Sequence, residues 1–207
     1  MATRTIGENV TVTTTGVRRK SFSETYIGEW LTTTDHKKIG LMYIIVAFFF
    51  FLVGGMEAML IRTQLSVPDG KVLDPETYNQ IFTMHGTTMI FLFVIPVLSG
   101  FGNYIVPLML GARDMAFPRM NAFGFWLLLF GGIFLQASFI IGQAPNGGWF
   151  MYAPLSQAAA GCGHGFQCTP HMNADFWILG TTLLGVSSIA GSLNFVVTIF
   201  KLRAPGM

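Results

Sequence analysis

The chain has 207 residues, of which 52% are hydrophobic and only 11% carry a charge, and its mean hydropathy is +0.55. This composition is typical of an integral membrane protein and excludes an ordinary soluble domain. The formal net charge is only +2, and the basic residues are dispersed rather than gathered into one patch. We therefore expect a lipid bilayer around the chain and no nucleic-acid partner.

Four mostly apolar segments are long enough to cross a bilayer, which takes about 20 helical residues. They are residues 39–61, 84–110, 122–141 and 176–200, and Glu57 is the only charged residue in them. We predict an all-α membrane protein with four transmembrane helices in residues 39–207. Residues 1–38 form a polar, Thr-rich tail without the apolar core of a signal peptide.

The basic residues predict how the helices are oriented. Ten of the twelve Lys and Arg residues fall on one side of the predicted spans, namely Arg4, Arg18, Arg19, Lys20, Lys37, Lys38, Arg113, Arg119, Lys201 and Arg203. Only Arg62 and Lys71 fall on the other side, and the loop 142–174 contains no Lys or Arg. The positive-inside rule therefore predicts that both termini are on the inner face and that this loop is outside.

His85 is the histidine at the edge of an apolar span, and an imidazole there needs a partner. It is either hydrogen-bonded to a neighbouring helix or an axial ligand to haem iron. Arg62 closes the first span at the same predicted face, so the two residues are expected at similar depth. Arg62 alone has the ordinary interpretation of a snorkelling arginine, with Glu57 as a local partner.

Polar residues mark the inner half of the predicted bundle. Asn103 lies about 27 Å beyond His85 along a helix, and Asp114 follows in a short inner loop. The other members of this group are Asn121, Ser187, Ser188 and Asn194. Such residues can hold a file of waters for proton transfer. Taken singly they also suit helix packing, and Thr181, Gly185, Ser188 and Ser192 form one small-residue face.

Several motifs together resemble subunit I of the haem-copper terminal oxidases, the cytochrome c oxidase family. They are Thr33-Thr-Asp-His-Lys-Lys-Ile-Gly40, Leu60-Ile-Arg-Thr-Gln-Leu65, Phe82-Thr-Met-His-Gly-Thr87, Gly102-Asn-Tyr-Ile-Val-Pro107, Asp114-Met-Ala-Phe-Pro-Arg-Met-Asn121, Gly148-Trp-Phe-Met-Tyr-Ala-Pro-Leu155 and Gly185-Val-Ser-Ser188 through Asn194-Phe195. They occur in the family's order and cover nearly the whole chain from residue 33. The resemblance implies that the four helices are part of the subunit I bundle.

The resemblance also implies roles for individual residues. His85 would be an axial ligand of the low-spin haem, Arg62 would hydrogen-bond the formyl group of haem A, and Trp149 would lie near the haem propionates. Asp114 would be the entrance of the D proton pathway. Asn103 and Asn121 would lie just above it, and further along would come Ser187, Ser188 and Asn194.

The family's subunit is expected to have about a dozen membrane-spanning helices, whereas four are predicted in this chain. The second axial histidine, the high-spin haem ligand, the copper B ligands and the glutamate that ends the D pathway would all lie beyond residue 207. This portion alone is therefore expected not to reduce oxygen, as a partial sequence or one piece of a split subunit. The expected partners are oxidase subunits II and III, and the expected location is the bacterial plasma membrane.

The electron donor is either cytochrome c or a quinol. Quinol-oxidising relatives carry an arginine and a histidine where this chain has Val53 and Thr77, although Glu57 and Gln80 are present. Cytochrome c is therefore the preferred donor. A four-helix transporter or assembly subunit without haem is the alternative from a different class, and it leaves the shared motifs unexplained.

Cys162, His164, Cys168 and His171 lie close together in the predicted outer loop. The two cysteines are predicted to form a disulfide or to be free, and a zinc site with the two histidines is a third alternative. The spacing is not one of the standard zinc patterns.

Overall fold

The computed structural model describes residues 25–142, 144–153 and 173–207. The chain divides into two units, residues 1–33 and 34–207, and each is described by itself. In the first unit the short helix α1 (Tyr26–Leu31) begins where the Thr25 hydroxyl accepts a hydrogen bond from the Gly28 N–H at 3.1 Å. This is the ordinary N-cap arrangement for threonine.

The described part of the second unit consists of helices and connecting segments. The elements are α2 (His36–Gln64), α3 (Pro75–Thr87), the π-helix η2 (Thr88–Val94), α4 (Ile95–Met109), α5 (Pro118–Ile141) and α6 (Asn173–Lys201). Four helical stretches are long and apolar enough to cross a membrane: His36–Gln64, Pro75–Met109, Pro118–Ile141 and Asn173–Lys201. The prediction of an all-α protein with four membrane-spanning helices is confirmed.

The second of these stretches begins earlier than the apolar residues alone predict. Asp74 caps it, because its carboxylate accepts from the Thr77 N–H at 3.1 Å, and Pro75 takes the first helical position. The predicted span from residue 84 therefore lies within a longer helix, whose first turns are polar. As a result His85 lies ten residues inside the helix rather than at its start.

A π-helical segment joins α3 to α4 within this same stretch. The Ile95 N–H bonds to the Ile90 carbonyl five residues earlier, and Pro96 follows directly. Proline has no N–H and its ring clashes with the carbonyl four residues before it. The wider π turn accommodates this interruption without ending the helix.

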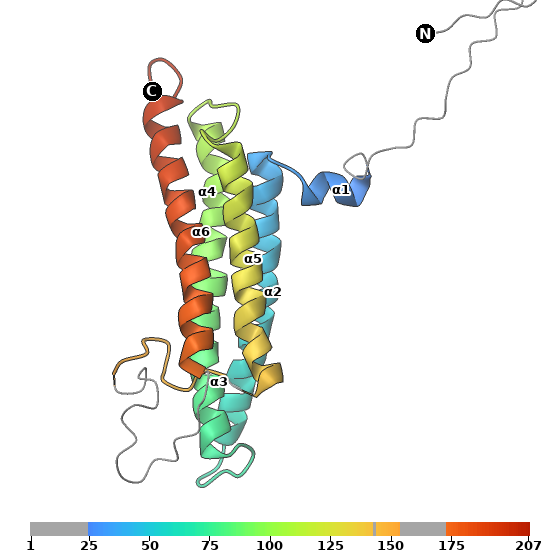
Figure 1. The fold of residues 1–207 in the computed structure, drawn as a ribbon, viewed down its shortest axis with the longest axis vertical. Helices are drawn as coiled ribbons and strands as arrows, with labels where there is room; N and C mark the ends of the chain where they lie inside the picture. Colours follow the sequence, from blue (N-terminus) through green and yellow to red (C-terminus); the bar gives the residue numbers. More distant parts are fainter. Residues whose placement is uncertain (1–24, 143, 154–172) are drawn as a thin grey trace, which may run out of the picture. The chain divides into compact units, whose positions relative to one another are not determined.

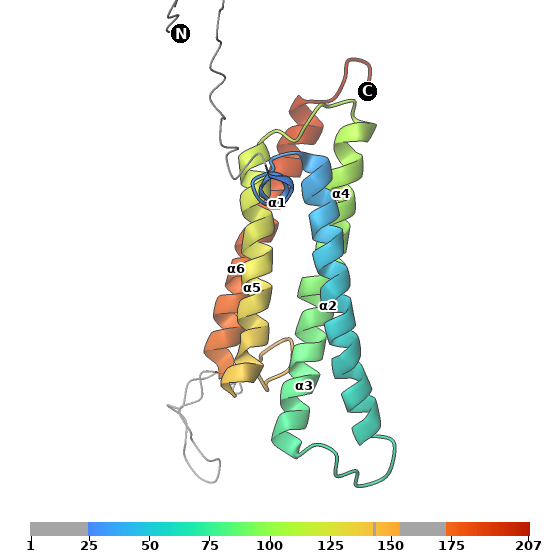
Figure 2. The ribbon, with the colours of Figure 1, turned by 90° about the vertical axis from the view of Figure 1, so that its right-hand side faces the viewer.

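The helices of the second unit pack in two pairs (Figures 1 and 2). Helix α5 packs along α6, and α2 packs along α3, η2 and α4. The pairs are joined mainly through contacts of α2 with α5 and of α4 with α6. A buried core formed by Tyr43, Phe50, Leu92, Phe125 and Leu135 lies between them.

Candidate functional site

His85 is held in one orientation by a backbone group of the neighbouring helix. Its Nδ1 lies 2.9 Å from the carbonyl oxygen of Gly54 in α2, and the side chain is half-buried. A carbonyl oxygen only accepts, so Nδ1 carries the hydrogen and Nε2 is left with its lone pair. This is the tautomer that a histidine needs in order to bind a metal through Nε2.

Trp149 packs against Gly86, the residue that follows His85. A Cβ atom placed on Gly86 would lie 3.1–3.3 Å from three atoms of the Trp149 side chain, so the indole lies directly against the backbone next to His85. The segment carrying Trp149 is tied to the same helix, because the Gly148 N–H donates to the Thr83 hydroxyl at 2.8 Å. The structure therefore brings Trp149 against Gly86, which lies 63 positions earlier in the sequence.

Arg62 lies further along α2 than the point that His85 contacts. Eight residues separate it from Gly54, which is about 12 Å along a helix axis. The guanidinium is exposed and makes no ion pair or hydrogen bond within the described residues. Arg62 therefore lies closer to the end of α2 than the carbonyl that His85 contacts, and the similar depth of Arg62 and His85 in a bilayer stays a prediction.

Glu57 is not the local partner of Arg62. Its side chain is 6% exposed, and neither carboxyl oxygen makes a hydrogen bond of normal geometry, although Thr88 and Gln136 lie beside it. The Gln136 amide instead donates to the Thr88 hydroxyl at 2.9 Å. Gln80, the other residue considered for a quinol site, donates to Glu76 at 3.3 Å.

Asp114 lies at the opposite end of the bundle, in a loop that α6 holds in place. The Asn194 side chain accepts from the Phe117 N–H at 2.9 Å and donates to the Phe117 carbonyl at 3.1 Å. The Thr198 hydroxyl accepts from the Ala116 N–H at 2.9 Å. Both polar atoms of the Asn194 side chain therefore anchor the segment that carries Asp114, which is half-buried.

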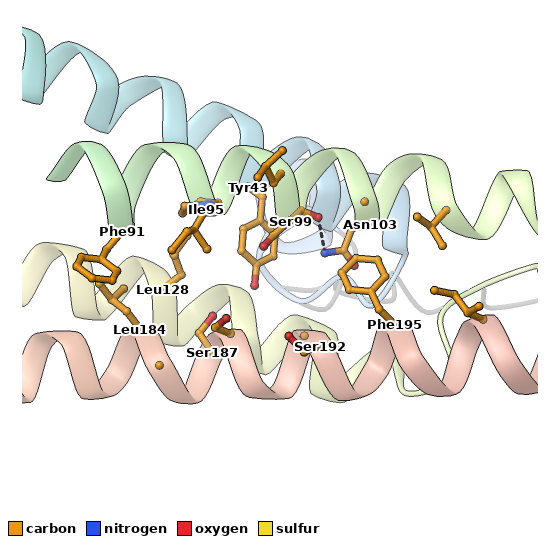
Figure 3. Close-up of a pocket in the computed structure, with 18 residues that line it drawn as sticks. Tyr43, Phe91, Ile95, Ser99, Asn103, Leu128, Leu184, Ser187, Ser192 and Phe195 are labelled. Atoms are coloured by element: carbon orange, nitrogen blue, oxygen red, sulfur yellow. Dashed lines mark hydrogen bonds between the residues drawn. The ribbon is translucent and has the colours of Figure 1, made fainter. Parts of the chain in front are cut away.

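A cavity of about 540 Å³ lies between α4 and α6, with α2 and α5 behind it (Figure 3). Its polar lining comes from Tyr43, Ser99, Asn103, Ser187, Ser188 and Ser192. The small-residue face of α6 therefore lines this cavity, and a Cβ on Gly185 would meet no described atom within 4 Å. Within the described residues, Gly185 has no helix packed directly against it.

Two buried asparagines near this end have an unpaired polar atom each. The Asn103 amide donates to the Ser99 carbonyl at 2.9 Å, and its side-chain oxygen has no partner. The side-chain nitrogen of Asn121 also has none within the described part of the chain. Both residues are 2% exposed, so each has a hydrogen-bonding group available to a bound water.

Tyr43 is a member of this site that the sequence analysis did not identify. It is 4% exposed, lies beside Ser187, and its hydroxyl approaches within 3.3 Å of where a Cβ on Gly124 would be. Ser187 itself donates to the Gly124 carbonyl at 2.6 Å. A tyrosine inside an apolar helix is a usable signal, because its hydroxyl needs a partner there.

The cysteines and histidines of residues 162–171 lie outside the described residues. Their prediction as a disulfide, a zinc site or free thiols therefore stays a prediction. Among the residues that are described, no group of three or more His, Cys, Asp or Glu side chains could hold a metal ion.

Comparison with known proteins decides the family. Residues 38–207 match the sequence model of the family described as Cytochrome C and Quinol oxidase polypeptide I. The chain belongs to this family. The resemblance found in the motifs is thereby confirmed, and the alternative of an unrelated four-helix transporter is removed.

Curated relatives from this oxidase family are similar over most of the chain. Cytochrome c oxidase subunit 1 of Bacillus subtilis (strain 168) is 49% identical over 179 residues, which is 86% of this chain and 27% of the relative. The protein of the same name from Bacillus sp. (strain PS3) is 47% identical over 191 residues, 92% of this chain and 30% of the relative. That from Corynebacterium efficiens is 48% identical over 181 residues, 86% of this chain and 30% of the relative. The chain thus spans less than a third of the length of these subunits.

Proposed function

We propose that this chain is the N-terminal part of the catalytic subunit of a terminal oxidase that passes electrons from cytochrome c to oxygen and pumps protons. The observation that carries the proposal is the hydrogen bond from His85 Nδ1 to the Gly54 carbonyl, because it leaves Nε2 as the ligand atom. Family membership supports the same assignment, since the family's members are haem and copper oxidoreductases.

His85 would hold the low-spin haem, haem A, from one side. The haem supplies an iron centre that gains and loses one electron at a time. Gly54 orients the imidazole, and Trp149 covers the adjoining backbone at Gly86. Arg62 would hydrogen-bond the haem's formyl group from the end of α2, where its side chain is exposed.

Asp114 would take up protons at the other end of the bundle. Asn194 and Thr198 hold its loop against α6, so they act on this route by fixing the carboxylate's position. Asn103 and Asn121 each have a free polar atom that can bind water, and Ser187, Ser188 and Tyr43 continue the polar lining through the cavity. Hydroxyl and amide groups at such spacing can support a chain of waters.

The orientation follows from the basic residues. The predicted inner side, to which Asp114 belongs, has ten of the twelve Lys and Arg residues of the sequence, so this side and both termini would face the cytoplasm of a bacterium. Cytochrome c is the proposed donor, because the relatives are named cytochrome c oxidases. Subunits II and III would be partners, and the high-spin haem and copper B would be held by the remainder of subunit I.

The haem assignment is tested in the complete oxidase. We expect His85→Ala to abolish the six-coordinate low-spin haem spectrum, because the other described histidine, His36, is buried at the opposite end of the bundle. Gln80→Ala, on the same helix, is the matched control and should keep the spectrum. Persistence of the spectrum in His85→Ala would refute the assignment.

The proton assignment is tested separately. Asp114→Asn should slow proton uptake severalfold while leaving the haem spectra unchanged, because an amide cannot take up the proton. Asp69→Asn, an exposed aspartate at the other end of the bundle, is the control. Unchanged proton uptake and pumping in Asp114→Asn would refute the assignment and indicate that these polar residues serve only helix packing.

A further inference from the structure

The carbonyl oxygen of Asn103 cannot make the hydrogen bond that an α-helix ordinarily provides. In α4 this oxygen would accept from the N–H four residues later. That residue is Pro107, inside the helix, and proline has no N–H. Asn103 is 2% exposed, so its carbonyl needs a donor from elsewhere in the protein.

His36 supplies this donor from another helix. Its Nδ1 lies 2.8 Å from the Asn103 carbonyl oxygen, and since that oxygen only accepts, Nδ1 carries the hydrogen. His36 is the first residue of α2 and is itself 2% exposed. A fully buried imidazole is thus committed to the one carbonyl that Pro107 leaves without a donor.

The backbones of α2 and α4 are in contact one turn away from this bond. A Cβ on Gly40 would lie 2.8 Å from the Gly100 carbonyl oxygen and 3.0 Å from the Tyr104 nitrogen. No side chain separates the helices at this point. The imidazole and the Asn103 carbonyl are therefore held at a fixed separation by backbone contacts.

Asn103 is also held on its side-chain side. Its amide nitrogen donates to the Ser99 carbonyl at 2.9 Å (Figure 3), and its side-chain oxygen is buried at the cavity wall with no partner among the described residues. With the carbonyl fixed by His36 and the nitrogen fixed by Ser99, the free oxygen has one defined position. This oxygen is the acceptor that Asn103 offers to a water in the cavity.

We propose that His36 is a positioning residue of the proton route. It replaces the helix hydrogen bond that Pro107 removes, and so keeps the free side-chain oxygen of Asn103 in place at the cavity. This inference rests on the proposed function of the cavity as a proton route. The inference predicts that proton uptake depends on the hydrogen-bond donor at the Nδ1 position of His36 and not on the size of its side chain.

The test uses the complete oxidase and measures proton uptake in a single turnover. We expect His36→Leu to slow uptake about tenfold, because an unpaired buried carbonyl will shift to find a donor. His36→Asn should retain uptake within about twofold of the wild type, since its Nδ2 is attached to the same carbon position as Nδ1. The low-spin haem spectrum, which reports on the other end of the bundle, should be unchanged in both.

A second-site variant makes the test specific. Pro107→Ala restores an N–H four residues after Asn103, so His36→Leu/Pro107→Ala should recover most of the lost uptake. Pro96→Ala is the matched control, because the N–H that it restores lies at the start of α4, away from the Asn103 carbonyl, and should not rescue His36→Leu. If His36→Leu does not assemble, His36→Asn and His36→Gln carry the comparison, with uptake retained in the first and slowed in the second.

Two outcomes overturn the inference. One is normal uptake in His36→Leu, or in His36→Gln where that pair is used. The other is slow uptake that neither His36→Asn nor Pro107→Ala restores. Asp114→Asn separates failure of this inference from failure of the proposed proton route. Normal uptake in Asp114→Asn would refute the proton route itself. Slow uptake in Asp114→Asn together with normal uptake in His36→Leu would refute only the role of His36.

Discussion

Gly40→Ala is the substitution whose effect the packing of α2 against α4 defines most sharply. The new methyl carbon would lie 2.8 Å from the Gly100 carbonyl oxygen and 3.0 Å from the Tyr104 nitrogen. Both atoms belong to the backbone, so no side-chain rotation relieves the contact and the helices must move apart. Overpacking costs about 1–3 kcal/mol, and alanine regains about 1 kcal/mol of helix propensity. The net loss of stability relative to the wild type is therefore about 0–2 kcal/mol, and relative to an alanine variant without the clash it is about 1–3 kcal/mol.

Gly55→Ala is the control for this prediction. Gly55 is in the same helix, and a Cβ there meets no described atom within 4 Å. In detergent, thermal loss of the native haem spectrum of the complete oxidase should occur a few degrees lower in Gly40→Ala than in Gly55→Ala. Gly40→Ala should also slow proton uptake, because it separates His36 from Asn103. Equal thermal stability of the two variants would refute the packing argument.

Two further predictions concern the ends of helices. Thr77 donates to the exposed Asp74 carboxylate through its N–H and its hydroxyl, and these bonds lower the pKa of Asp74 below its usual value. The stability that this cap contributes is therefore present above the pKa of aspartate in the unfolded chain and is lost as pH falls through the lowered pKa of the folded state. Asp74→Ala should speed hydrogen exchange at the Thr77 amide at neutral pH but not at strongly acidic pH. Asn194→Leu leaves the part-buried Phe117 N–H without its partner, at a cost of about 1–3 kcal/mol, whereas the Phe117 carbonyl keeps its bond from the Asn121 N–H. Proteolysis at the loop carrying Asp114 should then be faster than in the wild type, and an unchanged cleavage rate would contradict the anchoring role.

The start of the second membrane-spanning stretch shows which helix boundaries the sequence patterns can predict. Its apolar residues predict a span beginning at residue 84, yet the helix begins at Pro75. The signal was present, because Asp74 followed by Pro75 is the residue order that starts helices. Hydropathy missed it, since the turns between Pro75 and His85 are polar. The π segment before Pro96 has no comparable signal in the periodicity of the sequence.

For the candidate site, too, the sequence predicted part of what the structure shows. The motifs identified His85, Arg62, Trp149, Asp114 and the asparagines, but they did not show what each side chain contacts. Asn194 was expected within a file of proton-conducting residues, and in the structure both of its polar atoms hold Phe117. Tyr43 and His36 were missed as members of the site, because their partners lie on other helices.

The sequence by itself determined the membrane class, the four spans, the predicted orientation and the family, because hydropathy, charge bias and motif order are properties of short segments. Only the tertiary structure decided which nitrogen of His85 is free, which carbonyl His36 serves and what Asn194 holds. Those contacts join residues 31, 67 and 77 positions apart. They depend on the register between helices, and that register is set by close packing at glycines such as Gly40 and Gly100, which a one-dimensional pattern does not encode.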